Sequence, residues 1–378
     1  MRPAIAARLA REQSRRLAAD AQRRREVLEP VDAVTLRCNG RRLINFSGND
    51  YLGLAAHPEV ARAMAVAADR RVGAGASALV SGYAPEHREL EQALADWLGF
   101  EAAVVVATGY QANLALGQTL LGRGDQLLAD RLNHASLNDG ARLSGARIQR
   151  FRHADADDAG RMIGERTCWI ASDGVFSMDG DLAPLPALVG LADRHDLGLW
   201  LDDAHGLGVL GKTGRGILEH FAVDAGKIDA YVVTFGKALG TQGAAILGDE
   251  ALIETLTNRA RGIIYSTAMA PPLAAATSRA LAVLIDEPWR RSRLADNIKR
   301  FRQRADHLAL SASKSAIQPI IIGDNARALR VSARLAERGL LVRAIRPPTV
   351  PEGTARLRIT LTAAHQSGHI DQLVDALH

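Results

Sequence analysis

The sequence predicts an α/β fold, in which a large and mostly parallel sheet with helices on both faces is followed by a smaller α/β unit. Short apolar runs rich in β-branched residues alternate with segments of helical periodicity, a pattern typical of parallel sheets. Polar residues follow the predicted strand ends, where open α/β sheets bind their ligands. The composition turns basic and helical near Glu287-Pro288. We therefore expect an arm with short strands (1–43), a large domain (44–286) and a small C-terminal domain (287–378).

The composition is typical of a soluble enzyme. Of 378 residues, 47% are hydrophobic and 24% are charged, which is ordinary for a globular protein. No apolar run approaches the roughly 18 residues that span a bilayer, and the N-terminus lacks an apolar signal core, so a cytoplasmic protein without a membrane partner is expected. The net charge of +5 comes with dispersed arginines and only 4% aromatic residues, which favours an anionic substrate or cofactor over nucleic acid. Cys38 and Cys168 have no metal or redox spacing, so no metal site is predicted.

The first 29 residues are rich in alanine and arginine, with Leu9, Leu17 and Leu28 at loose helical spacing. This pattern predicts a solvated helix that packs on the body of the protein. A mitochondrial presequence is less favoured, because such peptides contain few acidic residues and this segment contains several. Arg23-Arg24-Arg25 is a candidate contact for an anion.

The next segment combines a strand, a glycine-rich loop and a helix. Residues 43–54 begin as a strand and end in a polar turn. The loop at 72–77 contains Gly73 and Gly75, and such loops allow a ligand or a neighbouring subunit to approach the backbone closely. A helix is predicted from Pro85 to a stop at Gly99.

An apolar run at 102–107 is of the kind found in buried parallel strands. It is followed by Thr108-Gly109-Tyr110 and a helix over 111–121. A glycine between a strand end and a helix start leaves the first-turn N–H groups free to hold a phosphate. An ordinary β-α turn has the same shape, so this signal depends on the rest of the site.

Histidine and serine candidates follow the next predicted strands. A strand at 127–129 leads to His134, and a strand at 168–172 leads to a loop that contains Ser177. His134 lies just past a strand end, where ligand-facing residues collect. A loop histidine without a role is the alternative reading.

The strand at 198–201, preceded by a helix over 186–195, ends in Asp202-Asp203-Ala204-His205-Gly206. Alternation along the strand places Asp202 where the strand leaves the core. Its carboxylate can pair with a ring-nitrogen cation, and His205 can reach a neighbouring ring oxygen. Ordinary capping of a strand end is the alternative, which a lysine on the next strand would disfavour.

That lysine is Lys237. The run Tyr231-Val232-Val233-Thr234 delivers it into a turn, with Gly236 and Gly240 on either side. In an apolar, partly desolvated pocket a lysine loses its proton more readily, and only the neutral amine attacks a carbonyl. The sequence therefore presents an amine that can form an imine.

The C-terminal region shows a further strand and a stiff loop. A strand at 243–247 and a long helix after Pro271-Pro272 precede it. Residues 355–361 alternate strictly, so Leu357, Ile359 and Leu361 are expected to face the core while Arg356, Arg358 and Thr360 face away. The proline-rich loop at 345–351 can hold Arg346 and Thr349 in fixed positions, and a last helix carries an apolar stripe from Ile370.

Together these parts predict a site for pyridoxal 5′-phosphate. Lys237 would bind the aldehyde, Asp202 would keep the ring nitrogen protonated, and His134 would stack on the ring. The amine of Lys237, once released, could move the Cα proton of an amino acid. The remaining candidates would hold the phosphate (Gly109, Tyr110, Thr234) or the ring oxygen (Ser177, His205).

Four motifs resemble those of the α-oxoamine synthases: residues 49–54, 176–181, 202–206 and 234–237. Members of this family are fold-type I pyridoxal phosphate-dependent transferases that condense an amino acid with an acyl thioester and release carbon dioxide. The resemblance covers the chain from the arm to the C-terminus. Two departures lie beside the site: Gly48 stands where a serine is common, and Ala238-Leu239 follows the lysine.

The resemblance implies substrates and further site residues. Residues 315–319 and 344–351 look like those of the members that use L-alanine with pimeloyl-CoA or a pimeloyl-acyl carrier protein. It implies that His134 also contacts substrate, that Arg23 and Thr349 are substrate contacts, and that Arg358 binds the amino acid carboxylate. It also implies a homodimer with sites at the subunit interface.

Other functions are compatible with parts of the sequence. Within the family, 5-aminolevulinate synthase and 2-amino-3-ketobutyrate CoA ligase use glycine, and the motif after Ile345 argues against both. A regulator that keeps pyridoxal phosphate without turnover would need a DNA-binding module, for which residues 1–43 are too short. An RNA-binding role for the arginine-rich arm is a further alternative.

Overall fold

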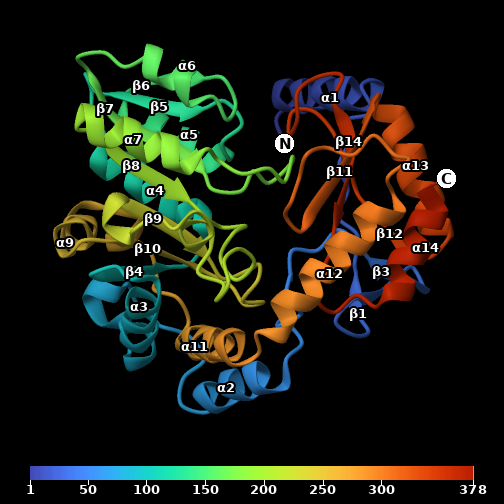
Figure 1. Ribbon diagram of the computed structural model, residues 1–378, viewed down its shortest axis with the longest axis horizontal. Coiled ribbons are helices and arrows are strands. Elements are labelled where there is room, and N and C mark those ends of the chain that lie inside the picture. The colour runs from blue at the N-terminus through green and yellow to red at the C-terminus, as the bar shows by residue number, and fades with distance from the viewer. Residues whose placement is uncertain (378) are drawn as a thin grey trace.

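A seven-stranded sheet forms the centre of the larger of two lobes (Figure 1). The computed structural model describes residues 1–377. All neighbouring strands are parallel except β10, which is antiparallel to both of its neighbours. The mostly parallel sheet is therefore confirmed. The order across the sheet is β4 (Ala102–Val106), β10 (Ala244–Gly248), β9 (Ala230–Thr234), β8 (Gly198–Asp202), β7 (Thr167–Asp173), β5 (Gln126–Asp130) and β6 (Arg147–Phe151).

Helices cover both faces of this sheet, as predicted. Alternate strand residues divide between two apolar clusters, so that Leu199 and Leu201 belong to one and Trp200 to the other. The first cluster includes α3 (Pro85–Leu98), α7 (Leu185–His195) and α11 (Pro271–Asp286), and the second includes α4 (Gly109–Leu120), α5 (Ala135–Ser144) and α9 (Glu250–Arg259). The shorter helices are α2 (Pro58–Ala68), α6 (Ala156–Arg161), α8 (Ile217–Phe221) and α10 (Arg261–Ile264).

The smaller lobe joins the two ends of the chain. Strands β1 (Glu29–Pro30), β2 (Thr35–Cys38) and β3 (Arg41–Asn45) share a sheet with β12 (Leu340–Leu341), which runs parallel to β3. A second, antiparallel sheet has the order β11 (Ile317–Gly323), β14 (Ala355–Thr360), β13 (Ala344–Ile345). The helices here are α1 (Pro3–Ala18), α12 (Trp289–Arg304), α13 (Asn325–Glu337) and α14 (Ser367–Leu377) (Figure 1). The predicted domain boundaries at 43 and 287 stay predictions.

Two elements, β4 and α1, are more exposed than the sequence predicted. The run at 102–106 is an edge strand, half-buried and antiparallel to β10, whereas a buried parallel strand was expected. Helix α1 ends at Ala18 and contains no buried residue, so the expected packing of the arm helix on the body is wrong for this chain. Leu9 and Leu17 remain 44% and 51% exposed.

Strand β14 is buried on both faces. Arg356 and Arg358 are only 4% and 7% exposed, so the expectation that this face is turned away from the interior is wrong. The Arg356 guanidinium donates to Asp179 Oδ1 (2.6 Å) in the larger lobe. The alternation predicted which side chains share a face, but not that the other lobe would cover it.

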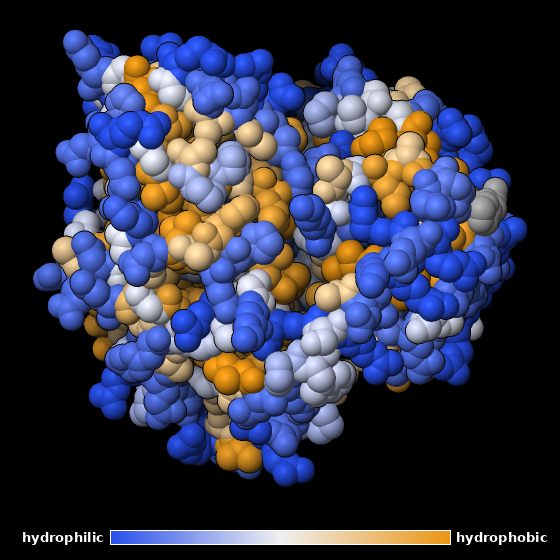
Figure 2. Space-filling view, in the orientation of Figure 1, coloured by the Kyte–Doolittle hydropathy of each residue, from blue (hydrophilic) through white to orange (hydrophobic). Residues whose placement is uncertain are grey.

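Apolar patches lie on the surface of both lobes in Figure 2. Figure 2 shows apolar side chains on the lobe that holds the large sheet, whereas the surface over α12 is hydrophilic. Among residues 1–377, no helix has both the length and the apolar character needed to cross a bilayer. The same residues include no group of three or more His, Cys, Asp or Glu side chains that could hold a metal ion.

Candidate active site

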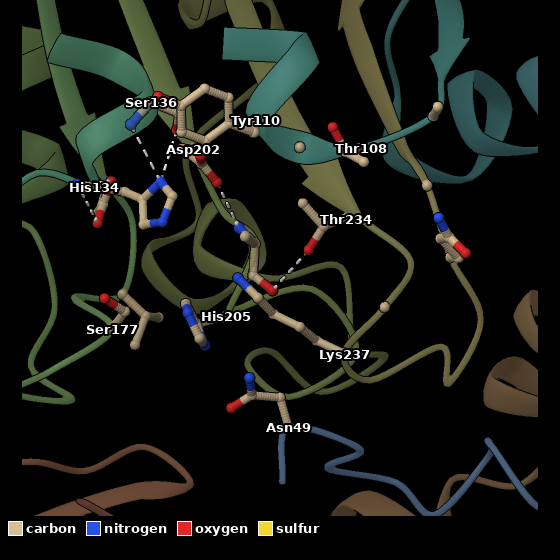
Figure 3. Close-up of a pocket in the computed structure, with 18 residues that line it drawn as sticks. Asn49, Thr108, Tyr110, His134, Ser136, Ser177, Asp202, His205, Thr234 and Lys237 are labelled. Atoms are coloured by element: carbon tan, nitrogen blue, oxygen red, sulfur yellow. Dashed lines mark hydrogen bonds between the residues drawn. The ribbon is translucent and has the colours of Figure 1, made fainter. Parts of the chain in front are cut away.

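A cavity of about 300 Å³ lies at the carboxyl ends of the parallel strands (Figure 3). Eight residues predicted for the site line this one cavity, although they come from five separate segments of the chain. They are Gly109, Tyr110, His134, Ser177, Asp202, His205, Thr234 and Lys237.

Lys237 enters the cavity from a tight turn after β9. A Cβ atom at Gly240 would come within 2.2 Å of the Ala55 backbone nitrogen, and Gly240 has a φ of +66°, so glycine is required where this turn packs on residues 54–55. Burial lowers the pKa of the Lys237 amine to about 8, although the neighbouring Asp202 and Asp173 carboxylates oppose the shift. This agrees with the expected loss of the proton in a desolvated pocket.

Asp202 is the last residue of β8 and is 6% exposed. Its Oδ2 accepts a hydrogen bond from Asn113 Nδ2 (2.6 Å), and its Oδ1 accepts from the Ala204 N–H (3.0 Å). Asn113 is itself oriented, because its Oδ1 accepts from Trp200 Nε1 (3.2 Å). The carboxylate is therefore held in one orientation at the edge of the cavity.

His134 caps the N-terminus of α5. Its backbone N–H donates to both oxygens of Asp173 (3.2 and 3.1 Å), and its Nδ1 lies 2.7 Å from Ser136 Oγ. Partial burial and the Lys237 charge lower the pKa of the His134 imidazole, while Asp202 raises it. The tyrosine ring of Tyr110 meets the imidazole edge to face at 6.4 Å. A neutral imidazole thus stands at one side of the cavity.

The start of α4 forms a cradle of free donors. Thr108 is the N-cap, and its Oγ1 accepts from the Gln111 N–H (3.1 Å). The remaining first-turn N–H groups, which include those of Gly109 and Tyr110, have no intrahelical acceptor. A Cβ atom at Gly109 would lie 2.5 Å from Thr234 Cγ2, so a side chain there would fill the space between helix start and strand end.

His205, Ser177 and Arg358 meet on the side of the cavity nearest the smaller lobe. His205 Nδ1 lies 2.7 Å from the Tyr51 hydroxyl. Arg358 Nε donates to the Ser177 carbonyl (2.5 Å), and Arg358 Nη1 donates to Asn49 Oδ1 (3.1 Å). Arg358 therefore contacts two residues of the cavity wall without lining it.

Arg23 and Thr349 lie together but outside this cavity. Arg23 Nη2 is 3.3 Å from Thr349 Oγ1 and 3.3 Å from the Pro347 carbonyl. Arg346 donates to the carbonyls of Asp20 and Gln22 (3.2 Å for the latter), so it holds the segment that leads to Arg23. Arg23 of the arm and Thr349 of the proline-rich loop thus form a cluster separate from the cavity.

Sequence reasoning missed three residues that support the site. Asp173 ends β7 in register with Asp202 on β8, so a second acidic strand end next to the first was a usable signal. Burial and Asp202 raise the pKa of Asp173 well above its usual range. Asn113 and Tyr51 carried no local signal, because their contacts are with residues 89 and 154 positions away.

The loop that carries Ser177 is anchored by a partly buried ion-pair cluster of His153, Asp130 and Asp181. His153 Nδ1 lies 3.0 Å from Asp130 Oδ1, and His153 Nε2 lies 2.7 Å from Asp181 Oδ2. Burial opposes the imidazolium charge, but the two carboxylates raise the pKa of His153 to about 10. The stability gained from this charge is complete below pH 6.5, the ordinary value, and is lost as the pH rises through about 10.

We expect His153→Gln to lower the free energy of unfolding by roughly 1–3 kcal/mol at pH 6, because it leaves the buried Asp130 without its cationic partner. The difference from the unsubstituted protein should shrink as the pH rises toward 10. Urea unfolding at pH 6, 8 and 10 measures this, with the exposed His195→Gln as control. A difference that does not change with pH would contradict the assignment of the charge to His153.

Comparisons with known proteins agree with this geometry. The family described as aminotransferase class I and II matches residues 41–377. An 8-amino-7-oxononanoate synthase from Ectopseudomonas mendocina is 50% identical over 378 residues, which cover 99% of this chain and 96% of that protein. The serine palmitoyltransferase of S. paucimobilis, solved with a bound PLP–myriocin aldimine, is 29% identical with a TM-score of 0.92 and covers 97% of this chain and 95% of its own. An 8-amino-7-oxononanoate synthase from Francisella tularensis is 30% identical with a TM-score of 0.79, covering 89% and 96%.

These likenesses extend over nearly the whole chain and confirm the predicted fold type I architecture. The larger sheet, the helices on both faces and the smaller lobe are all included in the match. The chain belongs to the class I and II aminotransferase family and, within it, to the 8-amino-7-oxononanoate synthases.

Proposed function

We propose that this protein is a pyridoxal phosphate-dependent acyltransferase of biotin biosynthesis. It condenses L-alanine with a pimeloyl thioester to give 8-amino-7-oxononanoate, carbon dioxide and the free thiol. The observation that carries the proposal is the convergence of Lys237, Asp202 and His134 on one cavity, in a chain 50% identical to a synthase of that name over its full length.

The residues of the cavity fit the cofactor. The space of about 300 Å³ is of the size that encloses a small ligand. The free N–H groups at the start of α4, together with Gly109 and Thr234, suit a phosphate because they offer donors at a helix N-terminus without a side chain in the way. Pyridoxal phosphate supplies an electron sink at the Cα atom of a bound amino acid.

The protein's own groups would control the proton at that atom. Lys237 would bind the aldehyde, and its lowered pKa would let the neutral amine accept the Cα proton of alanine near neutral pH. Asp202, fixed by Asn113 and the Ala204 N–H, would pair with the ring nitrogen and keep it protonated. His134 would stack on the ring, and Ser177 and His205 would hydrogen-bond the ring oxygen.

Arg358 is the proposed partner of the alanine carboxylate. It donates through Nε and Nη1 to the cavity wall, so these contacts hold its guanidinium beside the cavity. A planar guanidinium can bind a carboxylate with two parallel hydrogen bonds, which an ammonium cannot do.

We expect Arg358→Lys to raise the KM for alanine roughly 10- to 100-fold, the equivalent of one charge-assisted hydrogen bond. The KM for the thioester should change less. Steady-state kinetics with each substrate varied in turn measures this, and the exposed Arg327→Lys serves as the matched control. An unchanged KM for alanine would exclude Arg358 from carboxylate binding.

Arg23 and Thr349 are proposed contacts for the acyl thioester. Their cluster lies where the arm meets the proline-rich loop, and its charge suits a carboxylate or phosphate of that substrate.

The protein is also proposed to form a homodimer. Leu79, Val80 and Tyr265 are 52%, 78% and 71% exposed, and a Cβ atom at Gly73 would meet no atom of this chain within 4 Å. These features suit a second copy packed on this face, which sedimentation at several concentrations tests.

Assay of the purified protein tests the function. Free thiol should appear with pimeloyl-CoA and alanine, and comparison with pimeloyl-acyl carrier protein decides which carrier is preferred. Faster turnover with glycine and succinyl-CoA or acetyl-CoA would overturn the choice of substrates.

A further inference from the structure

Tyr51 lies directly behind His205, in the same turn as Asn49, which lines the cavity. It is 1% exposed and does not line the cavity. Its hydroxyl lies 2.7 Å from His205 Nδ1 and 3.2 Å from Asn49 Oδ1. Because Nδ1 is turned toward Tyr51, the other ring nitrogen, Nε2, is the one available to the cavity, where His205 is drawn beside Lys237 (Figure 3).

The tyrosine hydroxyl has one proton and two acceptors within reach. If it donates to Asn49 Oδ1, His205 must carry its proton on Nδ1 and present a bare Nε2 to the cavity. If it donates to His205 Nδ1, the imidazole proton must be on Nε2. The choice decides whether His205 is an acceptor or a donor toward the cofactor.

The contacts favour donation to His205. Asn49 Oδ1 already accepts from the Arg358 guanidinium (3.1 Å), and the contact to His205 is shorter by 0.5 Å. Burial raises the pKa of the Tyr51 phenol, although Arg358 opposes this, so the proton stays on the oxygen. Burial, together with the charges of Lys237 and Arg358, lowers the pKa of His205 well below its usual range, so its ring is neutral and has a single N–H.

We propose that Tyr51 is a positioning residue that fixes His205 in the Nε2–H tautomer, so that the cavity presents a hydrogen-bond donor to the phenolic oxygen of pyridoxal phosphate. The inference rests on the proposed function for the identity of that oxygen. The assignment of the tautomer itself rests only on residues of this chain. A donor at that position stabilises the ionised oxygen, whereas an acceptor would disfavour it.

The tautomer can be measured without the cofactor. In the ¹⁵N spectrum of histidine-labelled apoprotein, His205 should show a protonated Nε2 and an unprotonated Nδ1. Tyr51→Phe removes the donor and should shift His205 toward the Nδ1–H form, while the matched Tyr83→Phe, whose hydroxyl instead bonds Glu91, should leave it unchanged. Loss of the His205 signal in His205→Gln assigns the resonance.

Two results would overturn the inference: an Nδ1–H pattern in the unsubstituted protein, or an unchanged His205 pattern in a folded Tyr51→Phe. The Nδ1–H pattern is sought in the unsubstituted protein, so the proposal can be refuted even if Tyr51→Phe does not fold. With cofactor bound, Tyr51→Phe should alter the visible absorption band and lower kcat about tenfold, the effect of one lost hydrogen bond. Thiol release by the unsubstituted protein tests the proposed function separately, so the two can fail independently.

Discussion

Lys237→Ala is expected to abolish turnover, lowering kcat by roughly 10⁴-fold or more, the upper end of what a positioned proton-transfer group contributes. The variant loses both the amine that joins the aldehyde and the base that accepts the Cα proton, and no other lysine lines the cavity within residues 1–377. Absorption spectroscopy measures the first loss as the absence of the yellow band of the bound cofactor, and single-turnover thiol release measures the second.

The pH dependence of cofactor uptake is a second measurement that tests the role of Lys237. Only the neutral amine attacks the aldehyde, and burial sets the pKa of Lys237 at about 8. The rate of covalent uptake by the apoprotein should therefore rise with pH up to about 8 and then level off. The control is Lys227→Ala, because Lys227 is a surface residue paired with Asp193 (3.0 Å). Retention of the covalent cofactor in Lys237→Ala would show that another amine carries it.

Much of this site could be predicted from the sequence, because parallel strands end at one edge of a sheet. Lys237 and Asp202 follow neighbouring strands β9 and β8, and local alternation alone places them at that edge. The cradle at Gly109 was recognisable for the same reason. The end of a strand can be recognised from the local sequence, so a single sequence was enough to predict that these residues lie close together.

The expectations that were wrong, and the residues that were missed, depend on contacts between segments far apart in the sequence. Nothing in the alternation of β14 says that the larger lobe covers its second face, so the burial of Arg356 and Arg358 was not predictable. Helix α1 was expected to pack because it carries leucines, but no residue of it is buried in the described chain. Tyr51 acts on His205 across 154 positions, a distance at which periodicity carries no information.

Asp202→Asn is the second substitution with a large expected effect, a loss in kcat of roughly 100- to 1,000-fold. The change removes the negative charge that would hold a proton on the ring nitrogen but keeps the size of the side chain. The Asp202 charge also raises the pKa values of Lys237 and His134. Its removal should therefore move the pH at which cofactor uptake levels off from about 8 to a lower value.

Asp203→Asn separates this electrostatic effect from a general disturbance of the turn. Asp203 is fully buried and accepts from the Tyr231 hydroxyl (2.6 Å) and the Ile217 N–H (2.8 Å). Because burial raises its pKa to about 7, the neutral form of the side chain is accessible near neutral pH, so the amide replaces a form that the fold accepts. Asp203→Asn should keep most of the activity, and the shift in cofactor uptake should be larger in Asp202→Asn. Equal losses in both variants would mean that the turn, and not the charge opposite the ring nitrogen, is what the reaction requires.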